Sequence, residues 1–242
     1  MALEELVRDD EGDYEDEGRR NRSVLLGAAV VTVIALVAAW LIWPKGGDND
    51  ATGEAAPAPV ADGCPPMPSS DEIPTTAPPV TWELFNGAAL PASAEDGPAV
   101  LEGPIARCYS HTPTGALIAA VQINIRSLVD PAGGLSVVRE QMVPGEGREA
   151  LAEALRKRGA PGEVSGTPVG FCQVAGYRFV TYTPDEAVVA LAADCGDVFQ
   201  VTELRVQWRD GDWHQVREPD GSSSPTVASA QDLRGFAVWR GV

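Results

Sequence analysis

TPTGALIAAVQINIRSLV, residues Thr112–Val129, predicts the element around which the C-terminal part of the chain is built. Thr112 is a suitable N-cap, and Pro113 occupies the first helical position, where a missing N–H costs nothing. Apolar side chains recur every three to four residues through about Val129, and Asp130-Pro131 ends the helix. Because this helix is apolar on nearly all sides, we expect other elements to surround it.

Downstream of this helix the apolar pattern changes twice. Two shorter helices are predicted at Leu135–Met142 and Gly147–Arg158, the second capped by Gly159. The apolar period then becomes two, which is typical of half-buried strands. The strand candidates are residues 168–182, 187–195, 198–209 and 212–217. Helices followed by a run of antiparallel strands predict an α+β domain.

Asp210-Gly211 predicts a two-residue hairpin turn, which fixes the pairing of the strands on either side of it. Arg209 then faces Asp212, and Trp208 faces Trp213. Because the pair next to such a turn is hydrogen-bonded, the two tryptophans occupy the closer, non-hydrogen-bonded position. An aromatic pair at that position stabilises a sheet by up to about 1 kcal/mol.

The four cysteines are expected to form two disulfides. Cys172 and Cys195 flank the turn at Pro184-Asp185, whose pairing brings them within one diagonal step, an offset that a bulge or a slightly longer loop absorbs. We therefore predict a Cys172–Cys195 disulfide and, by elimination, Cys64–Cys108. The alternative is four unrelated buried thiols. A zinc site is disfavoured, because no two cysteines have the C-x₂₋₄-C spacing.

A membrane anchor is predicted at Ser23–Trp43, SVLLGAAVVTVIALVAAWLIW, which contains 21 residues and no charge. A bilayer core needs roughly 20 apolar residues as a helix. A cleaved signal peptide is the alternative, but its apolar core is shorter and lacks a closing tryptophan pair. Arginines precede the segment and acids follow it, so the positive-inside rule places the N-terminus in the cytoplasm and residues 44–242 outside.

The anchor divides the chain into four predicted parts. Residues 1–22 carry nine acids against four arginines, which predicts a disordered cytoplasmic tail. Residues 44–80 are rich in proline and are expected to form a semi-rigid extracytoplasmic linker. Residues 81–242 form the exported domain. Its first segment supplies candidate core contacts in a short strand or irregular packing segment: Trp82, Leu84, Phe85 and Leu90.

The sequence contains few candidate residues for catalysis or metal binding. The formal charge of −17 argues against direct nucleic-acid binding, which needs clustered Lys and Arg. His111 precedes the long helix and His214 lies opposite Gln207, so the histidines have neither metal nor catalytic spacing. Asp210 and Asp212 flank a tight turn, where acids occur for reasons of turn geometry. We therefore assign no catalytic, cofactor-binding or metal-binding residue, and we expect no enzymatic activity.

Several motifs carry a family resemblance. The order of helices followed by antiparallel strands resembles the nuclear-transport-factor-like cone, in which helices pack on a curved antiparallel sheet. The layout of anchor, linker and exported domain resembles inner-membrane scaffolds of type IV secretion. The motifs resemble uncharacterised membrane proteins of actinobacterial integrative and conjugative elements: CYSHTPTGALIAA (Cys108–Ala120), EQMVPGEGR (Glu140–Arg148), VQWRDGDWH (Val206–His214) and GFAVW (Gly235–Trp239).

Three functional hypotheses follow. The first is a non-enzymatic scaffold or assembly protein of the cell envelope, belonging to a conjugation or type IV secretion-like apparatus, that binds other subunits or copies of itself. The second is an exported cone-fold domain that binds a ligand, or acts as an enzyme, in a pocket between helix and sheet. The third is a membrane-bound regulator that acts through its acidic cytoplasmic tail.

Overall fold

Helix α2 (Pro113–Val129) forms as the sequence predicts, and its start and end are confirmed. The Thr112 side chain accepts a hydrogen bond of 2.9 Å from the Gly115 N–H, which caps the first turn. The computed structural model describes residues 63–130, 132–158, 172–225 and 227–240, all of which belong to one compact unit, Ala56–Val242. Most of the helix is buried, as its apolar circumference requires.

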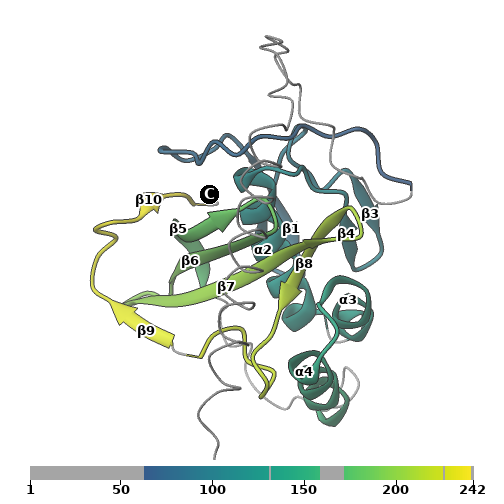
Figure 1. Cartoon of the computed structure of the whole chain (residues 1–242). Helices are drawn as coiled ribbons and strands as arrows, with labels where there is room; N and C mark the ends of the chain where they lie inside the picture. Colours follow the sequence, from purple (N-terminus) through teal and green to yellow (C-terminus); the bar gives the residue numbers. More distant parts are fainter. Residues whose placement is uncertain (1–62, 131, 159–171, 226, 241–242) are drawn as a thin grey trace, which may run out of the picture. The chain divides into compact units, whose positions relative to one another are not determined.

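Two shorter helices follow α2, within about a residue of the expected bounds. They are α3 (Gly134–Gln141) and α4 (Glu146–Lys157). Figure 1 shows both beside β8 (Asp212–Val216), at the edge of the main sheet. The predicted cap of α4, Gly159, lies outside the described residues.

The main sheet is antiparallel in every described strand pair, so the α+β prediction is confirmed at this level. Its strand order is β10-β5-β6-β7-β8, and β9 also pairs with β7, beyond the end of β8. The other strands are β5 (Gln173–Thr183), β6 (Glu186–Asp194), β7 (Phe199–Arg209), β9 (Val227–Ala230) and β10 (Ala237–Val238).

Both register predictions are confirmed. Trp208 faces Trp213 across the β7–β8 turn, with ring centroids 5.3 Å apart. The β5–β6 pairing shifts by one residue at each of two irregularities, between Val174 and Gly176 and between Phe179 and Thr181. Together these shifts absorb the two-residue offset predicted from the turn.

The two disulfides are those that the sequence predicts. Cys172 bonds Cys195, with a Cα–Cα distance of 4.4 Å, and Cys64 bonds Cys108, with a Cα–Cα distance of 5.4 Å. The first bond joins the chain just before β5 to the chain just after β6. The second ties the proline-rich segment to the residues that lead into α2.

Two small hairpins precede α2: β1 (Thr81–Phe85) with β2 (Ala88–Ala92), and β3 (Val100–Glu102) with β4 (Ile105–Arg107). The first turns at Asn86-Gly87, where both residues have positive φ, as a two-residue hairpin turn requires. Leu90 is fully buried, but Leu84 is 81% exposed. The expectation that Leu84 belongs to the core is therefore wrong, because its part of β1 has no described layer above it.

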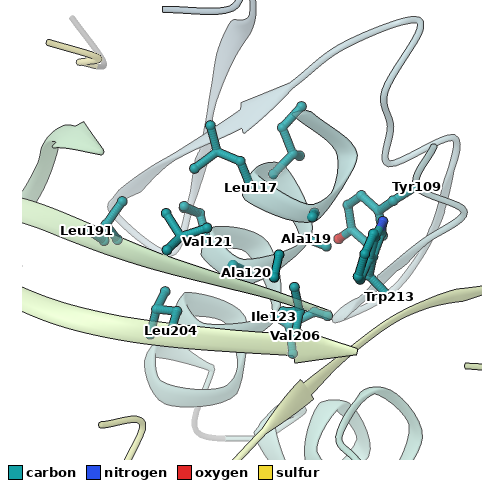
Figure 2. Packing of buried hydrophobic residues seen from close by; sticks show 14 of the residues in the cluster. Tyr109, Leu117, Ala119, Ala120, Val121, Ile123, Leu191, Leu204, Val206 and Trp213 are labelled. Atoms are coloured by element: carbon teal, nitrogen blue, oxygen red, sulfur yellow. The ribbon is translucent and has the colours of Figure 1, made fainter. Parts of the chain in front are cut away.

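The core lies between α2 and one face of the sheet. Figure 2 shows Val121 of α2 directed toward Leu191 of the sheet, and Ile123, from another side of the helix, directed toward Val206. All of these side chains are buried. This layer fixes the face of each strand that meets the helix.

Part of the predicted linker contacts the domain. The Pro68 carbonyl accepts the His111 N–H at 3.2 Å, the Thr76 carbonyl accepts the Tyr177 hydroxyl at 3.1 Å, and Cys64 is in a disulfide. The section from residue 64 to residue 80 is therefore held against the domain. The acidic tail and the predicted anchor Ser23–Trp43 lie outside the described residues, within which no helix is long and apolar enough to cross a bilayer.

Candidate functional site

A pocket of about 350 Å³ lies between the C-terminal half of α2 and the main sheet. A cavity of this size is at the small end of the range of ligand pockets, roughly 300–1,000 Å³. Helix α2, β2, β5, β6 and β7 all contribute to its lining. The lining residues are Ala88, Ala89, Asn124, Ile125, Leu128, Val129, Cys172, Gln173, Val174, Leu191, Ala193, Gln200, Thr202 and Leu204.

The pocket forms because the strands present small side chains at this end of the helix. In the β6–β7 register Leu191 faces Thr202 and Ala193 faces Gln200, and all four side chains line the pocket. Alternate residues of a strand share one face, so these positions continue the face that packs on α2. Alanine and threonine do not reach the helix as leucine does, and a space is left.

The lining is mostly apolar and carries no ionisable side chain. None of the lining residues, all of which lie in the described ranges, is Asp, Glu, Lys, Arg or His. Cys172 is bonded to Cys195 and presents no thiol. The pocket therefore has neither a general acid or base nor a nucleophile of the usual kinds, and its chemistry is that of binding.

A buried polar network lies directly behind the pocket. The Arg217 side chain donates to Asn124 Oδ1 at 3.0 Å, to Ser127 Oγ at 3.2 Å and to Gln215 Oε1 at 3.1 Å. Burial lowers the pKa of Arg217 to about 10, so the group remains protonated at neutral pH. Within the described residues no carboxylate lies within ion-pair distance of Arg217.

Asp212 has a structural role that the sequence analysis missed. Its carboxylate is buried and accepts the backbone N–H groups of Cys108 at 2.7 Å, Tyr109 at 3.0 Å and Trp213 at 2.9 Å. Burial raises the pKa of Asp212, and the three N–H donors oppose this shift. Asp212 therefore joins the hairpin to the entrance of α2, which turn geometry alone does not explain.

The two histidines do not line the pocket. The His111 ring stacks on Trp208 with centroids 4.1 Å apart, and its Nε2 lies 2.6 Å from the Pro184 carbonyl oxygen. His214 pairs with Gln207 across the β7–β8 register, as expected. Trp208 and Trp213 lie with His111 at the opposite end of α2 from the pocket.

Comparison with known proteins gives one family match. Residues 46–238 match the family described as Domain of unknown function (DUF8175). The chain belongs to this family. No curated protein and no solved structure matches. The DUF8175 match includes the proline-rich segment from residue 46 onward, and in the structure residues 64–80 of that segment contact the domain.

In this DUF8175 domain, sequence reasoning located the disulfides and offered a pocket between helix and sheet as an alternative, but it named none of the lining residues as pocket residues. Cys172 was predicted as one half of a disulfide, and it also lines the pocket. Nothing in the sequence marks Asn124 or Thr202 as a pocket residue, because each lies within a regular helix or strand pattern. The useful information was the nearness of two short helix-facing side chains, Ala193 and Thr202, which needs the β6–β7 register to be recognised.

Proposed function

We propose that this chain is a membrane-anchored, extracytoplasmic binding protein that holds a mostly apolar small molecule between α2 and the sheet. The observation that carries the proposal is the pocket of about 350 Å³ lined without ionisable groups. Apolar walls with a few fixed polar groups are the usual composition of a small-molecule site. Since no acid, base or nucleophile lines it, the proposed role is binding without chemical change of the ligand.

The architecture supports this proposal. Three helices followed by an antiparallel sheet, with α2 packed across one face, have the order of a nuclear-transport-factor-like cone. That fold often encloses a pocket between its helix and its sheet. The likeness is one of arrangement, and the function is argued from the site.

The disulfides support the proposed location. Both cysteine pairs are bonded, and disulfides persist in oxidising compartments outside the cytoplasm. Ser23–Trp43 supplies the anchor in this proposal, with residues 1–22 in the cytoplasm. The ligand would then reach the pocket from the extracytoplasmic side or from the membrane.

Photolabelling of the full chain in lipid nanodiscs tests the binding function. A medium-chain alkyl diazirine is expected to label peptides of α2, β6 and β7 that contain pocket residues. Ala193→Leu adds bulk inside the pocket and should remove this labelling, whereas Val180→Leu, at an exposed position of β5, should not. Labelling that both variants leave unchanged would contradict a ligand site at this pocket.

A second candidate function is that of a positional scaffold in a conjugation or type IV secretion-like apparatus. It is favoured by the covalent tie between Cys64 and Cys108, which fastens the segment that follows the predicted anchor to the domain, and by the family resemblance of its motifs. Its mechanism is to hold the domain near the membrane where other subunits bind. Unchanged transfer frequency from a donor in which the gene is deleted would rule this function out.

A further inference from the structure

We infer that the pocket selects an acyl ligand, an apolar chain that ends in a carboxylate or ester oxygen, held by the side-chain amides of Asn124 and Gln173. This inference rests on the proposed binding function and specifies its ligand. It depends on which atom of each side-chain amide, the oxygen or the nitrogen, remains free to meet a ligand.

The Asn124 amide is oriented by its neighbours. Its Oδ1 accepts from Arg217 Nη2 at 3.0 Å and lies 3.4 Å from Gln215 Nε2. Arginine has only donors, so the atom facing it must be the oxygen. Gln215 agrees, because its own Oε1 accepts from Arg217 and leaves its Nε2 for Asn124. The Asn124 Nδ2, with two N–H donors, remains for the pocket that this residue lines.

The Gln173 amide is also held through its oxygen, which leaves its nitrogen as the free donor. Its Oε1 accepts the Ala89 backbone N–H at 3.3 Å, and a backbone N–H can only donate. Gln173 Nε2 is therefore the group left at the pocket, which both Gln173 and Ala89 line. Two amides from different elements thus present donors to the same space. A ligand that satisfies them must carry acceptors.

The charge behind the pocket favours an anionic acceptor. Arg217 is buried, and its partners in the described structure are the neutral side chains of Asn124, Ser127 and Gln215. A buried cation with neutral partners keeps a positive potential that water screens weakly. This potential polarises the Asn124 amide toward the pocket. A ligand ammonium group would find side-chain acceptors only at Gln200 and Thr202, while it met the two amide donors and the positive charge of Arg217, and it is disfavoured.

The remaining walls fit a hydrocarbon chain. Ile125, Leu128, Leu191 and Leu204 are apolar side chains around the amide donors. The volume of about 350 Å³ suits one chain of medium length and is too small for a whole phospholipid. The acyl group is the chemistry common to a free fatty acid and to an acyl ester, and the probes below distinguish these two sources.

Three photoreactive probes with the same medium-length alkyl diazirine chain test the inference on the full chain in nanodiscs. They end in a carboxylate, a methyl ester and a primary amine. The carboxylate should label pocket peptides most and the ester less. The amine should label about tenfold less than the carboxylate, as the loss of one hydrogen bond to a charged group predicts. Stronger labelling by the ester than by the carboxylate would assign the site to an esterified chain.

Two near-isosteric variants test the donors. Asn124→Asp replaces the pocket-facing amide nitrogen by oxygen and supplies Arg217 with a carboxylate partner. Gln173→Glu makes the same replacement at an exposed position, where the fold is not at risk. Either variant should reduce carboxylate labelling by about tenfold, and both should raise amine labelling. Melting curves of both variants check that the fold is retained.

The outcomes separate this inference from the proposed function. If all three probes label the pocket equally, Ala193→Leu removes the labelling and the two acidic variants change nothing, the pocket binds but the acyl inference is wrong. If no probe labels the pocket peptides, the proposed binding function itself fails. Preference for the amine in the unaltered chain would overturn the inference directly.

Discussion

The two ends of the interface between α2 and the sheet are filled differently. At the aromatic end, defined by Tyr109, Trp208 and Trp213, large rings occupy the space beside the start of α2. At the pocket end, around Ala193 and Thr202, the sheet leaves a cavity of about 350 Å³ under the last turns of the same helix.

The difference is one between the large ring of Trp208 at one end of β7 and the short side chains of Thr202 and Ala193 at the other end of the β6–β7 pair. On the helix-facing side of β7 the residues run from Trp208 through Leu204 to Thr202. On β6 the corresponding face ends in Leu191 and Ala193. The helix crosses both ends, so a pocket opens where the strand side chains become short. One continuous layer is therefore tightly filled at one end and leaves a cavity at the other.

Removing a ring at the aromatic end should have the largest effect. Trp213 is 1% exposed, and its Nε1 donates to the Ser110 carbonyl at 2.9 Å. Trp213→Ala should lower the free energy of unfolding by about 3–5 kcal/mol, measured by denaturant titration. Thr202→Ala at the pocket end should cost less than about 1 kcal/mol. Equal losses would show that the two ends do not differ in packing.

The two disulfides extend the comparison, since Cys64–Cys108 lies near the aromatic end and Cys172–Cys195 at the pocket end. Replacing either pair by alanine should cost about 2–4 kcal/mol, because each bond restricts the unfolded chain. The sequence separations are 44 and 23 residues, so loss of Cys64–Cys108 should cost roughly 0.6 kcal/mol more. A greater loss at Cys172–Cys195 would contradict this order and indicate that the pocket end depends on its disulfide for more than chain entropy.

High pH should act on the aromatic end. Burial, with a smaller contribution from Asp71, raises the pKa of Tyr182 to about 12, and its ring lies 6.5 Å from that of Trp213. Burial, together with the nearby Asp212 carboxylate, also raises the pKa of Tyr109. An unfolded tyrosine loses its proton near pH 10. Between about pH 10 and 12 the folded state therefore binds more protons than the unfolded state, and stability falls as pH rises.

Melting temperatures measured between pH 9 and 12 check this expectation. The Tyr182 hydroxyl is buried without a hydrogen-bond partner among the described residues, so Tyr182→Phe should have little effect at neutral pH. The variant should lose stability less steeply above pH 10 than the unaltered chain. An identical slope in both proteins would mean that Tyr182 ionises equally easily in the folded and unfolded states.

The same comparison shows what the sequence could predict. Helix α2, the Trp208–Trp213 register and the Cys172–Cys195 disulfide followed from local rules, because caps, two-residue turns and strand alternation act over short distances. The Cys64–Cys108 disulfide then followed by elimination. Asp212 was assigned to its turn because its partners, the N–H groups of Cys108 and Tyr109, are about a hundred residues away in the chain. Contacts of that range leave no local pattern.

A pocket between helix and sheet was one of the alternatives, but its residues could not be predicted, for a related reason. Ala193 and Thr202 are ordinary strand residues, and only their pairing beneath α2 turns their small size into a cavity. Leu84 was predicted to be a core residue but is exposed, since an apolar residue in a strand is buried only where another layer covers it. The Asn86-Gly87 turn was a local signal, and it would have predicted the β1–β2 hairpin.

The smallest expected effect on stability, and the most specific, comes from two alanines of β6. Ala193 lines the pocket, whereas Ala190 is fully buried on the other face of the strand. Ala193→Leu should fill space and raise the free energy of unfolding by roughly 0.5–1 kcal/mol. Ala190→Leu should overpack its site and lower it by about 1–3 kcal/mol. Equal losses in denaturant titrations would mean that both positions are tightly packed, and the short side chain of Ala193 would then not be a cause of the pocket.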